Sequence, residues 1–247
     1  MAALDFGTRN MAPEIMDDAA ASYEDFHAVL VDLSRVNRLT LAYRPTIAFL
    51  DRLVCRFPKD RPVEIVDVGC GYGDLLREID VWATRRGVEV SLTGVDLSPW
   101  SQRAAVHATA AGRPIKWITA NAKEYRPPAG IDVVVSSQFT HHLTDPDVTR
   151  FVAWMEATAR LAWHVSDLHR HRIPYDLFRG LTSVASFHPW ISHDGCVSIG
   201  RAFDRADWCR LVAAAGLDGA SVSIDWWLPF RLSVGRVRPP GVSAARR

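Results

Sequence analysis

The sequence predicts an α/β protein with a doubly wound, mostly parallel sheet of seven strands that ends in an antiparallel C-terminal hairpin. Three observations carry this prediction. A glycine-rich turn at 69–73 joins an apolar strand to a helical pattern, and strand and helix patterns then alternate as far as residue 166. Finally, strand patterns at 221–227 and 230–237 are separated by so short a turn that the two strands must be antiparallel.

Two helices are expected before the first strand. Apolar residues recur at helical spacing between Tyr23 and Leu53, and the pattern is interrupted before Pro45. The polar stretch 1–20 contains Pro13 and is predicted to be a loose arm. We therefore assign 1–56 to an N-terminal arm and cap helices.

The remaining elements follow in order. Strands are predicted at 63–68, 90–96, 115–122, 131–137 and 161–166, and crossover helices at 74–86, 99–111 and 147–161. Ser98 is a plausible N-cap with Pro99 in the first helical position, and Asp204 and Asp207 open a last helix at 203–216. This core occupies 57–237. The tail at 238–247 is rich in Pro, Gly and Arg and is predicted to be disordered.

The segment 167–201 is too long for a simple connection and is predicted to be an insert that caps a substrate. It mixes aromatic residues with histidines, which suits a pocket for a flat, partly apolar molecule. The same aromatic side chains are also what the small core of a lid would need.

Composition excludes several classes of function. The chain has 247 residues, is 48% hydrophobic, and carries 29 basic and 28 acidic residues, a net charge of +1. This balance gives no indication of nucleic acid or an anionic membrane. Four widely spaced cysteines without a C-x-x-C pair, and no signal sequence or long apolar run, predict a cytoplasmic protein without a membrane span. A homodimer is compatible with the sequence.

The glycine turn favours a ligand with a cationic part. Its pattern is G-x-G-x-G, whereas a dinucleotide fold needs G-x-G-x-x-G. Asp74 stands where the third glycine of that motif would be, and a carboxylate at the start of a helix would repel a pyrophosphate. Asp67, at the end of the preceding strand, adds a second negative charge.

The segment V-D-V-G-C-G-Y-G at 66–73 resembles the first motif of the class I S-adenosylmethionine-dependent methyltransferases, and three further motifs follow in order. The resemblance implies a Rossmann-like methyltransferase fold with S-adenosyl-L-methionine as cofactor. In it, Asp96 accepts hydrogen bonds from the ribose hydroxyls, Asn121 accepts one from the adenine amino group, and Arg44 reaches the carboxylate. The implied cofactor-binding residues are Asp67, Gly69, Cys70, Gly71, Gly73, Asp96, Leu97, Asn121, Ala122, Ser137 and Arg44.

Three histidines are candidate general bases. His141 and His142 follow the fourth strand, next to the expected methyl position, and His169 follows the fifth. A histidine has a suitable pKa for accepting the proton of a hydroxyl acceptor. A histidine pair is common at this loop in the resembling family and could serve only to hold the loop.

The loop S-S-Q-F after the fourth strand lacks the N-P-P-Y type of pattern of enzymes that methylate nucleic-acid bases. Asp145 and Asp167 are the only acids near it, which disfavours a bound metal ion. We therefore predict a metal-independent methyltransferase of secondary metabolism, acting on a hydroxyl of a small aromatic, polyketide-like or quinone-like acceptor. Transfer to carbon or nitrogen, an NAD(P)-dependent reductase and a non-catalytic cofactor-binding module are the alternatives.

Overall fold

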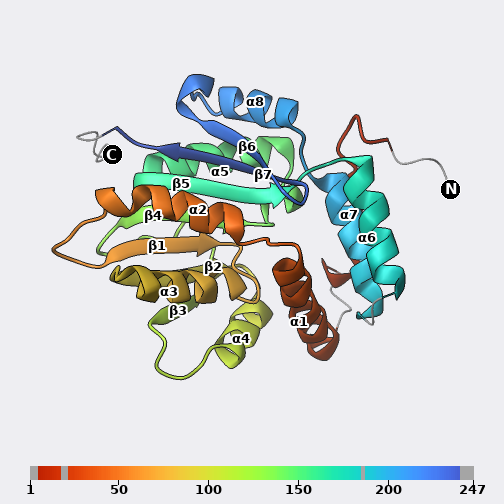
Figure 1. The fold of residues 1–247 in the computed structure, drawn as a ribbon, viewed down its shortest axis with the longest axis horizontal. Coiled ribbons are helices and arrows are strands. Elements are labelled where there is room, and N and C mark those ends of the chain that lie inside the picture. The colour runs from red at the N-terminus through yellow and green to blue at the C-terminus, as the bar shows by residue number, and fades with distance from the viewer. Residues whose placement is uncertain (1–4, 18–21, 185–186, 240–247) are drawn as a thin grey trace.

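The computed structural model describes residues 5–17, 22–184 and 187–239. Within these residues the chain forms a seven-stranded sheet with the order β3-β2-β1-β4-β5-β7-β6 (Figure 1). β7 runs antiparallel to both its neighbours, and every other pair is parallel. The predicted sheet and its C-terminal hairpin are confirmed. Of the predicted tail, the part from residue 240 lies outside the described residues.

The strand order reverses between β1 and β4, which pair as parallel central strands. Parallel sheets bind ligands beyond the carboxyl ends of the strands at such a switch point. The site is therefore expected where β1 and β4 end. The strands are β1 (Val63–Val68), β2 (Val90–Asp96), β3 (Ile115–Thr119), β4 (Ile131–Ser137), β5 (Ala159–Leu168), β6 (Ser223–Trp227) and β7 (Arg231–Val237).

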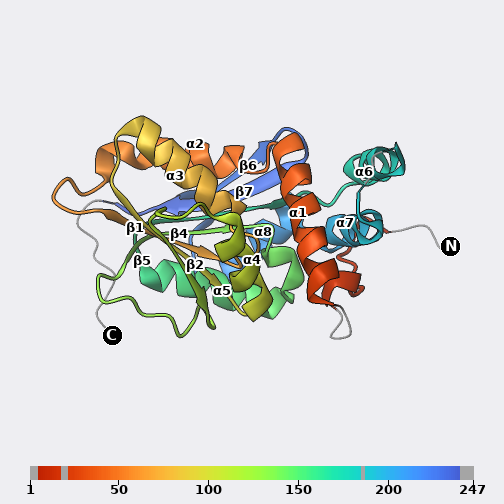
Figure 2. The same cartoon turned by 90° about the horizontal axis from the view of Figure 1, so that it is seen from below.

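Helices cover both faces of the sheet (Figure 2). On one face, α2 (Arg44–Leu53) and α3 (Asp74–Arg86) bury apolar side chains such as Phe49, Leu50 and Leu76 against β1 and β4. On the other face, α5 (Asp145–Thr158) and α8 (Arg205–Ala214) bury Phe151 and Trp208. α4 (Pro99–Ala108) packs beside β2 and β3.

Three helices lie beyond the carboxyl ends of the strands, on the right of Figure 1. They are α1 (Tyr23–Leu39), α6 (Arg172–Val184) and α7 (Pro189–Arg201). The last two form the insert predicted at 167–201. α1 packs against α7, so segments far apart in the sequence form one cap over the switch point. No helix in the described part of the chain is long and apolar enough to cross a membrane.

The N-terminal arm differs from the prediction. Its described part, residues 5–17, is docked against the loop after β4 and is not loose. The Arg9 guanidinium donates to the carbonyl oxygens of His141 and Leu143 at 3.0 and 2.9 Å, and it pairs with Asp145 at 2.6 Å. It also lies over the Phe203 ring, 4.0 Å from its centroid. The polar composition of residues 1–20 predicted an exposed arm. The arm is docked because the Arg9 side chain donates to backbone carbonyl groups of the loop after β4.

The other differences concern element ends. α4 stops at Ala108, before Gly112, and the Ser98 side chain makes no capping hydrogen bond, while the Ser98 backbone N–H donates to Asp96. α5 begins at Asp145, since the Thr144 hydroxyl accepts from the Asp147 N–H and so caps the helix earlier than expected. The capping box of Asp204 and Asp207 is confirmed.

Candidate active site

The glycine turn forms an open floor at the end of β1. Gly71 has a φ of 48°, and a Cβ built on it would meet nothing within 4 Å. At Gly73, by contrast, a Cβ would lie 2.2 Å from the Trp117 ring, so this glycine is needed for packing. A ligand can therefore approach the backbone at Gly71 but not at Gly73.

Asp96 is fixed at the end of β2 by two backbone N–H groups. Its Oδ2 accepts from Gly71 and its Oδ1 from Ser98, each at 2.9 Å. A carboxylate has about four lone-pair positions, so each oxygen can still accept another hydrogen bond. Leu97, 71% exposed, adjoins it on the cavity wall and offers an apolar surface.

Acidic groups gather beneath this floor. Asp67 is buried and its Oδ1 has no hydrogen-bond partner among the described residues. Burial raises the pKa of Asp67 well above its usual range, and the charges of Asp74 and Asp96 raise it further. A cationic or hydrogen-bond-donating ligand would relieve this arrangement, whereas a second anion would not.

Asp74 occupies the N-terminus of α3. Its Oδ2 accepts from the Tyr43 hydroxyl at 2.6 Å and from the Asn37 amide at 3.0 Å. Asn37 comes from α1 and Tyr43 is the N-cap of α2, so the leading helices are tied to the glycine turn. A pyrophosphate would meet this carboxylate at the helix end, which agrees with the argument against a dinucleotide site.

The remaining sequence-predicted residues of the β ends line the same cavity. Asn121 is exposed after β3, where its Oδ1 accepts from the Lys123 N–H at 3.1 Å and its Nδ2 donates to Glu124. The Ser137 hydroxyl, at the end of β4, has no partner among the described residues. The structure brings together Asp67, Gly69, Cys70, Gly71, Asp96, Leu97, Asn121, Ala122 and Ser137 around this cavity, while Gly73 supports it from behind.

This cavity has a volume of about 740 Å³ and continues from the glycine turn to the cap. Its far walls are mostly apolar and come from α1, α6 and α7. They include Phe26, Leu30, Leu33, Phe178, Leu181 and Ile191. The space has a polar end that suits a nucleoside and an apolar end that suits a second molecule.

His141, which lines this cavity, forms a buried pair with Asp167 behind it. The His141 Nδ1 lies 2.7 Å from Asp167 Oδ1, and His141 is only 3% exposed. Burial alone would raise the pKa of Asp167, but the charge of His141 and hydrogen bonds from His141 and Thr140 lower it to about 2. An ionised Asp167 can only accept, so Nδ1 carries the hydrogen and Nε2 is the position that can take up a proton.

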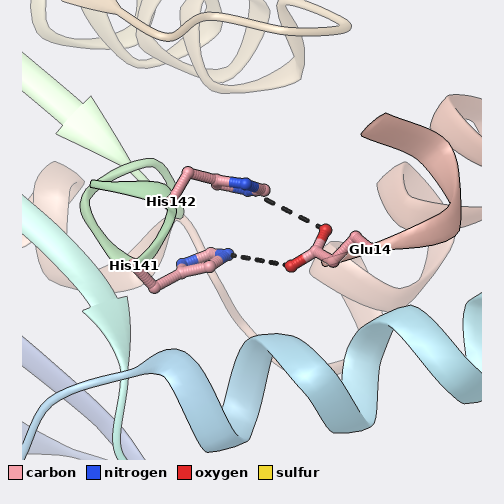
Figure 3. A group of neighbouring side chains, drawn as sticks. All are labelled: Glu14, His141 and His142. Atoms are coloured by element: carbon pink, nitrogen blue, oxygen red, sulfur yellow. Dashed lines mark ion pairs between the residues drawn. The ribbon is translucent and has the colours of Figure 1, made fainter. Parts of the chain in front are cut away.

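The N-terminal arm brings Glu14 to this pair (Figure 3). Glu14 Oε1 lies 3.9 Å from His141 Nε2, and Oε2 lies 4.0 Å from His142 Nε2. These three side chains could hold a metal ion, because one donor atom from each lies within 4.8 Å of the others. Glu14 Oε1 also accepts from the Ser198 hydroxyl at 2.7 Å and lies 3.7 Å from Arg201, so α7 already supplies a positive charge.

Comparison with known proteins identifies the domain. Residues 65–162, which contain the glycine turn, Asp96 and the His141 loop, match the family model described as "Methyltransferase domain". The chain carries a methyltransferase domain. This match agrees with the predicted class I S-adenosylmethionine-dependent methyltransferase family, and similar structures were solved with S-adenosylmethionine or S-adenosylhomocysteine bound. No curated protein sequence gives a match.

Solved structures support the fold of this methyltransferase. Human N-acetylserotonin methyltransferase is similar with a TM-score of 0.60 and 12% identity, over 88% of this chain and 56% of that one. The CMeT domain of the citrinin polyketide synthase gives 0.57 and 15%, over 79% of this chain and 52% of that one. Magnesium protoporphyrin IX methyltransferase from Synechocystis PCC 6803 gives 0.53 and 13%, over 91% of both chains. The chain therefore spans about half the length of the first two.

Arg44 is not brought into the cavity of the methyltransferase. It is exposed at the start of α2 and lines a separate depression with Arg38, Asp51 and Glu78. The reason is local, since Tyr43 turns inward to Asp74 and the next residue of the helix must then face outward. His169 does line the cavity. Burial and the neighbouring His171 lower its pKa, and its Nδ1 has no partner among the described residues.

Two residues of the site could not be found from the sequence. Glu14 comes from the predicted loose arm, and Arg231 from the start of β7. Arg231 lines the cavity although it is only 2% exposed. No sequence signal marks Arg231 as a cavity residue, because its burial becomes apparent only in the folded structure.

Proposed function

We propose that the protein transfers a methyl group from S-adenosylmethionine to a hydroxyl of a small, aromatic, polyketide-like or quinone-like acceptor without a metal ion. The observation that carries this proposal is the single cavity that joins the Gly71 floor and Asp96 to the His141–Asp167 pair. Cofactor, acceptor and base would then share one space, which a displacement reaction needs.

The residues present fit the cofactor. Gly71 leaves room for a ligand against the backbone, and Asp96 offers oxygens to the ribose hydroxyls. Asn121 stands at the adenine end, the Asp74 carboxylate would lie near the cationic part, and Asp67 keeps an unpartnered oxygen there. When bound, S-adenosylmethionine supplies an electrophilic methyl group on a sulfonium.

The apolar end of the cavity supports an aromatic acceptor. Its walls are aliphatic and aromatic side chains of α1, α6 and α7, which would cover a flat molecule and exclude water. Two of the similar methyltransferases are named for magnesium protoporphyrin IX and N-acetylserotonin, which are also cyclic. We assign α1, α6 and α7 to a substrate cap on this basis.

His141 is our choice among the histidines for the general base. Asp167 holds its ring through Nδ1, so Nε2 can accept the acceptor's hydroxyl proton and the carboxylate can stabilise the resulting imidazolium. The His142 ring lies beside it, tilted by 35° with 4.3 Å between ring centroids, and would position it. The His169 ring stacks on His171, and its Nδ1 has no hydrogen-bond partner in the described structure.

We assign Glu14, which lies beside His141 and His142, the role of positioning these two rings and of accepting a proton from them. Its carboxylate already faces Arg201 and Ser198, so no further cation is needed for charge balance. We expect dialysis against a strong chelator to leave methyl transfer unchanged. Loss of activity that returns on adding zinc or iron would show instead that Glu14, His141 and His142 hold a catalytic metal.

The test is turnover with a panel of acceptors matched in size. Phenols, naphthols and hydroquinones would be incubated with S-adenosylmethionine beside aromatic amines and ring-activated carbon acceptors, and products read by mass spectrometry. We expect a mass gain of one methyl group for hydroxyl acceptors. Products only from amines or carbon acceptors would replace O-methylation by those reactions. Binding of cofactor without any turnover would favour a non-catalytic module.

A further inference from the structure

Arg231 is a buried guanidinium without a full set of partners. It is the first residue of β7 and lines the cavity beneath the junction of α1 and α2. Nη2 donates to the Thr40 hydroxyl at 2.9 Å, whereas Nε and Nη1 have no hydrogen-bond partner among the described residues. Leaving such a group buried and unpaired costs several kcal/mol.

The nearest acid does not satisfy it. Asp167 is the main charge acting on Arg231, but its oxygens are already used. Oδ1 accepts from His141 Nδ1 and from the Leu168 N–H, each at 2.7 Å, and Oδ2 accepts from the Thr140 hydroxyl and the His141 N–H. Burial lowers the pKa of Arg231 to about 10, so the side chain remains charged at neutral pH.

The other cations of the cavity wall are differently placed. The Arg201 guanidinium donates to the carbonyl oxygens of His141 and His142 and faces Glu14. Lys123 is exposed beside Asn121. Arg231 therefore combines a permanent charge, deep burial and unused donors at the cavity wall, and an anionic ligand would complete it.

We propose that Arg231 binds a carboxylate of a ligand in this cavity. A carboxylate matches the planar fork of a guanidinium with two parallel hydrogen bonds. It could belong to the amino acid part of S-adenosylmethionine or to an acid group on the acceptor. The Asp74 carboxylate on the β1 side and Arg231 on the β7 side present opposite charges, as an amino acid zwitterion requires, and this favours the cofactor.

This inference rests on the proposed function, and its test uses a pair of cofactor fragments. S-adenosylhomocysteine carries the amino acid part and methylthioadenosine lacks it. Calorimetric titration of wild type, Arg231→Gln and Arg236→Gln would give the affinities. Arg236 is the matched control because it lies on β7 outside the cavity and faces Glu156 at 3.6 Å.

We expect Arg231→Gln to weaken S-adenosylhomocysteine binding by about 10- to 100-fold and methylthioadenosine binding by less than about 2-fold. Arg236→Gln should change neither affinity. If wild type binds neither compound, the cofactor assignment itself fails. Equal losses for both compounds in Arg231→Gln would show general damage to the site and overturn the inference.

A second arm covers the acceptor as the source of the carboxylate. If Arg231→Gln leaves S-adenosylhomocysteine affinity unchanged, the complexes would be titrated with benzoate and with benzyl alcohol. Weaker binding of benzoate alone in Arg231→Gln would assign the carboxylate to the acceptor. The same benzoate affinity in both proteins, or no benzoate binding to either, would overturn the proposal.

Discussion

At the scale of single residues, Asp96 is the residue that we propose for the ribose hydroxyls, because it both accepts from the Gly71 N–H and lines the cavity. We expect Asp96→Ala to weaken S-adenosylhomocysteine binding by about 1.5 to 3 kcal/mol for each charged hydrogen bond lost. Calorimetry measures this. Asp218→Ala is the control, since Asp218 also accepts from a backbone N–H but lies outside the cavity. An unchanged affinity in folded Asp96→Ala would remove its ribose role.

His141 tests the chemistry at the same scale. His141→Gln removes the group that accepts the proton, so we expect kcat to fall by about 10² to 10⁴ while cofactor affinity stays close to that of wild type. Asp167→Asn should also lower kcat, because the ring would lose its charged acceptor. His169→Gln is the matched comparison. If it lowers kcat and His141→Gln does not, the base is His169.

Site residues could be predicted where a local sequence pattern determines their position. Asp67, the glycines and Asp96 lie at strand ends whose positions follow from local apolar patterns. Arg231 and Glu14 reach the cavity only because β7 inserts beside β5 and the arm crosses to the loop after β4. Arg44 shows the reverse case, since a charged residue near the right junction faces away.

The insert is the element that shapes the acceptor end. α6 and α7 approach closely at Gly195, where a Cβ would lie 2.1 Å from the Phe178 ring. Gly195→Val should push α6 outward and raise the KM for the acceptor several-fold, while leaving the S-adenosylhomocysteine affinity unchanged, because α6 packs mainly against α7. Gly180→Val, on α6 with open space at its Cβ, is the control. Equal KM values for both variants would contradict the role of the cap.

Sequence patterns predicted this insert as a cap but not its two helices. The helical pattern of this segment is interrupted by Pro174, Gly180 and Gly195. The structure shows why a glycine is needed at 195, since α6 and α7 pack closely there. The crossover helices were predicted closely because their apolar faces are continuous. Their starts shifted where a side chain such as Thr144 capped earlier.

His164 governs how the stability of the whole molecule responds to acid. It is buried in β5, stacked on Phe49 with ring centroids 4.5 Å apart, and burial followed by the charge of Arg52 lowers its pKa from 6.5 to about 3. Below pH 6.5 the His164 side chain is protonated in the unfolded chain but stays neutral in the folded chain. Stability is therefore fully present above this pH and is lost as the pH falls toward 3.

The loss should reach about 2 kcal/mol at pH 5 from this group alone. His164→Phe keeps a ring on Phe49 and removes the titration, so its free energy of unfolding should change less between pH 7.5 and about 5 than that of wild type. Urea unfolding at both pH values measures the difference. An identical pH dependence in the two proteins would show that folding does not lower the pKa of His164.

At the scale of the whole molecule, the sheet follows from the alternation of strands and helices, and its reversal between β1 and β4 places the cavity. The sequence could not show that α1, α6 and α7 meet above this point, because nothing local connects residues 23–39 with 172–201. The cap is a product of topology, and we propose that it sets the acceptor specificity.

The most direct test of the central claim is the position of the transferred methyl group. S-adenosylmethionine with an isotopically labelled methyl would be incubated with the protein and a hydroxynaphthoquinol acceptor, and the product examined by carbon NMR. We predict a methoxy resonance whose rate of appearance falls sharply in His141→Gln. A C-methyl or N-methyl resonance, or a methoxy signal that His141→Gln leaves unchanged, would contradict transfer to oxygen with His141 as base.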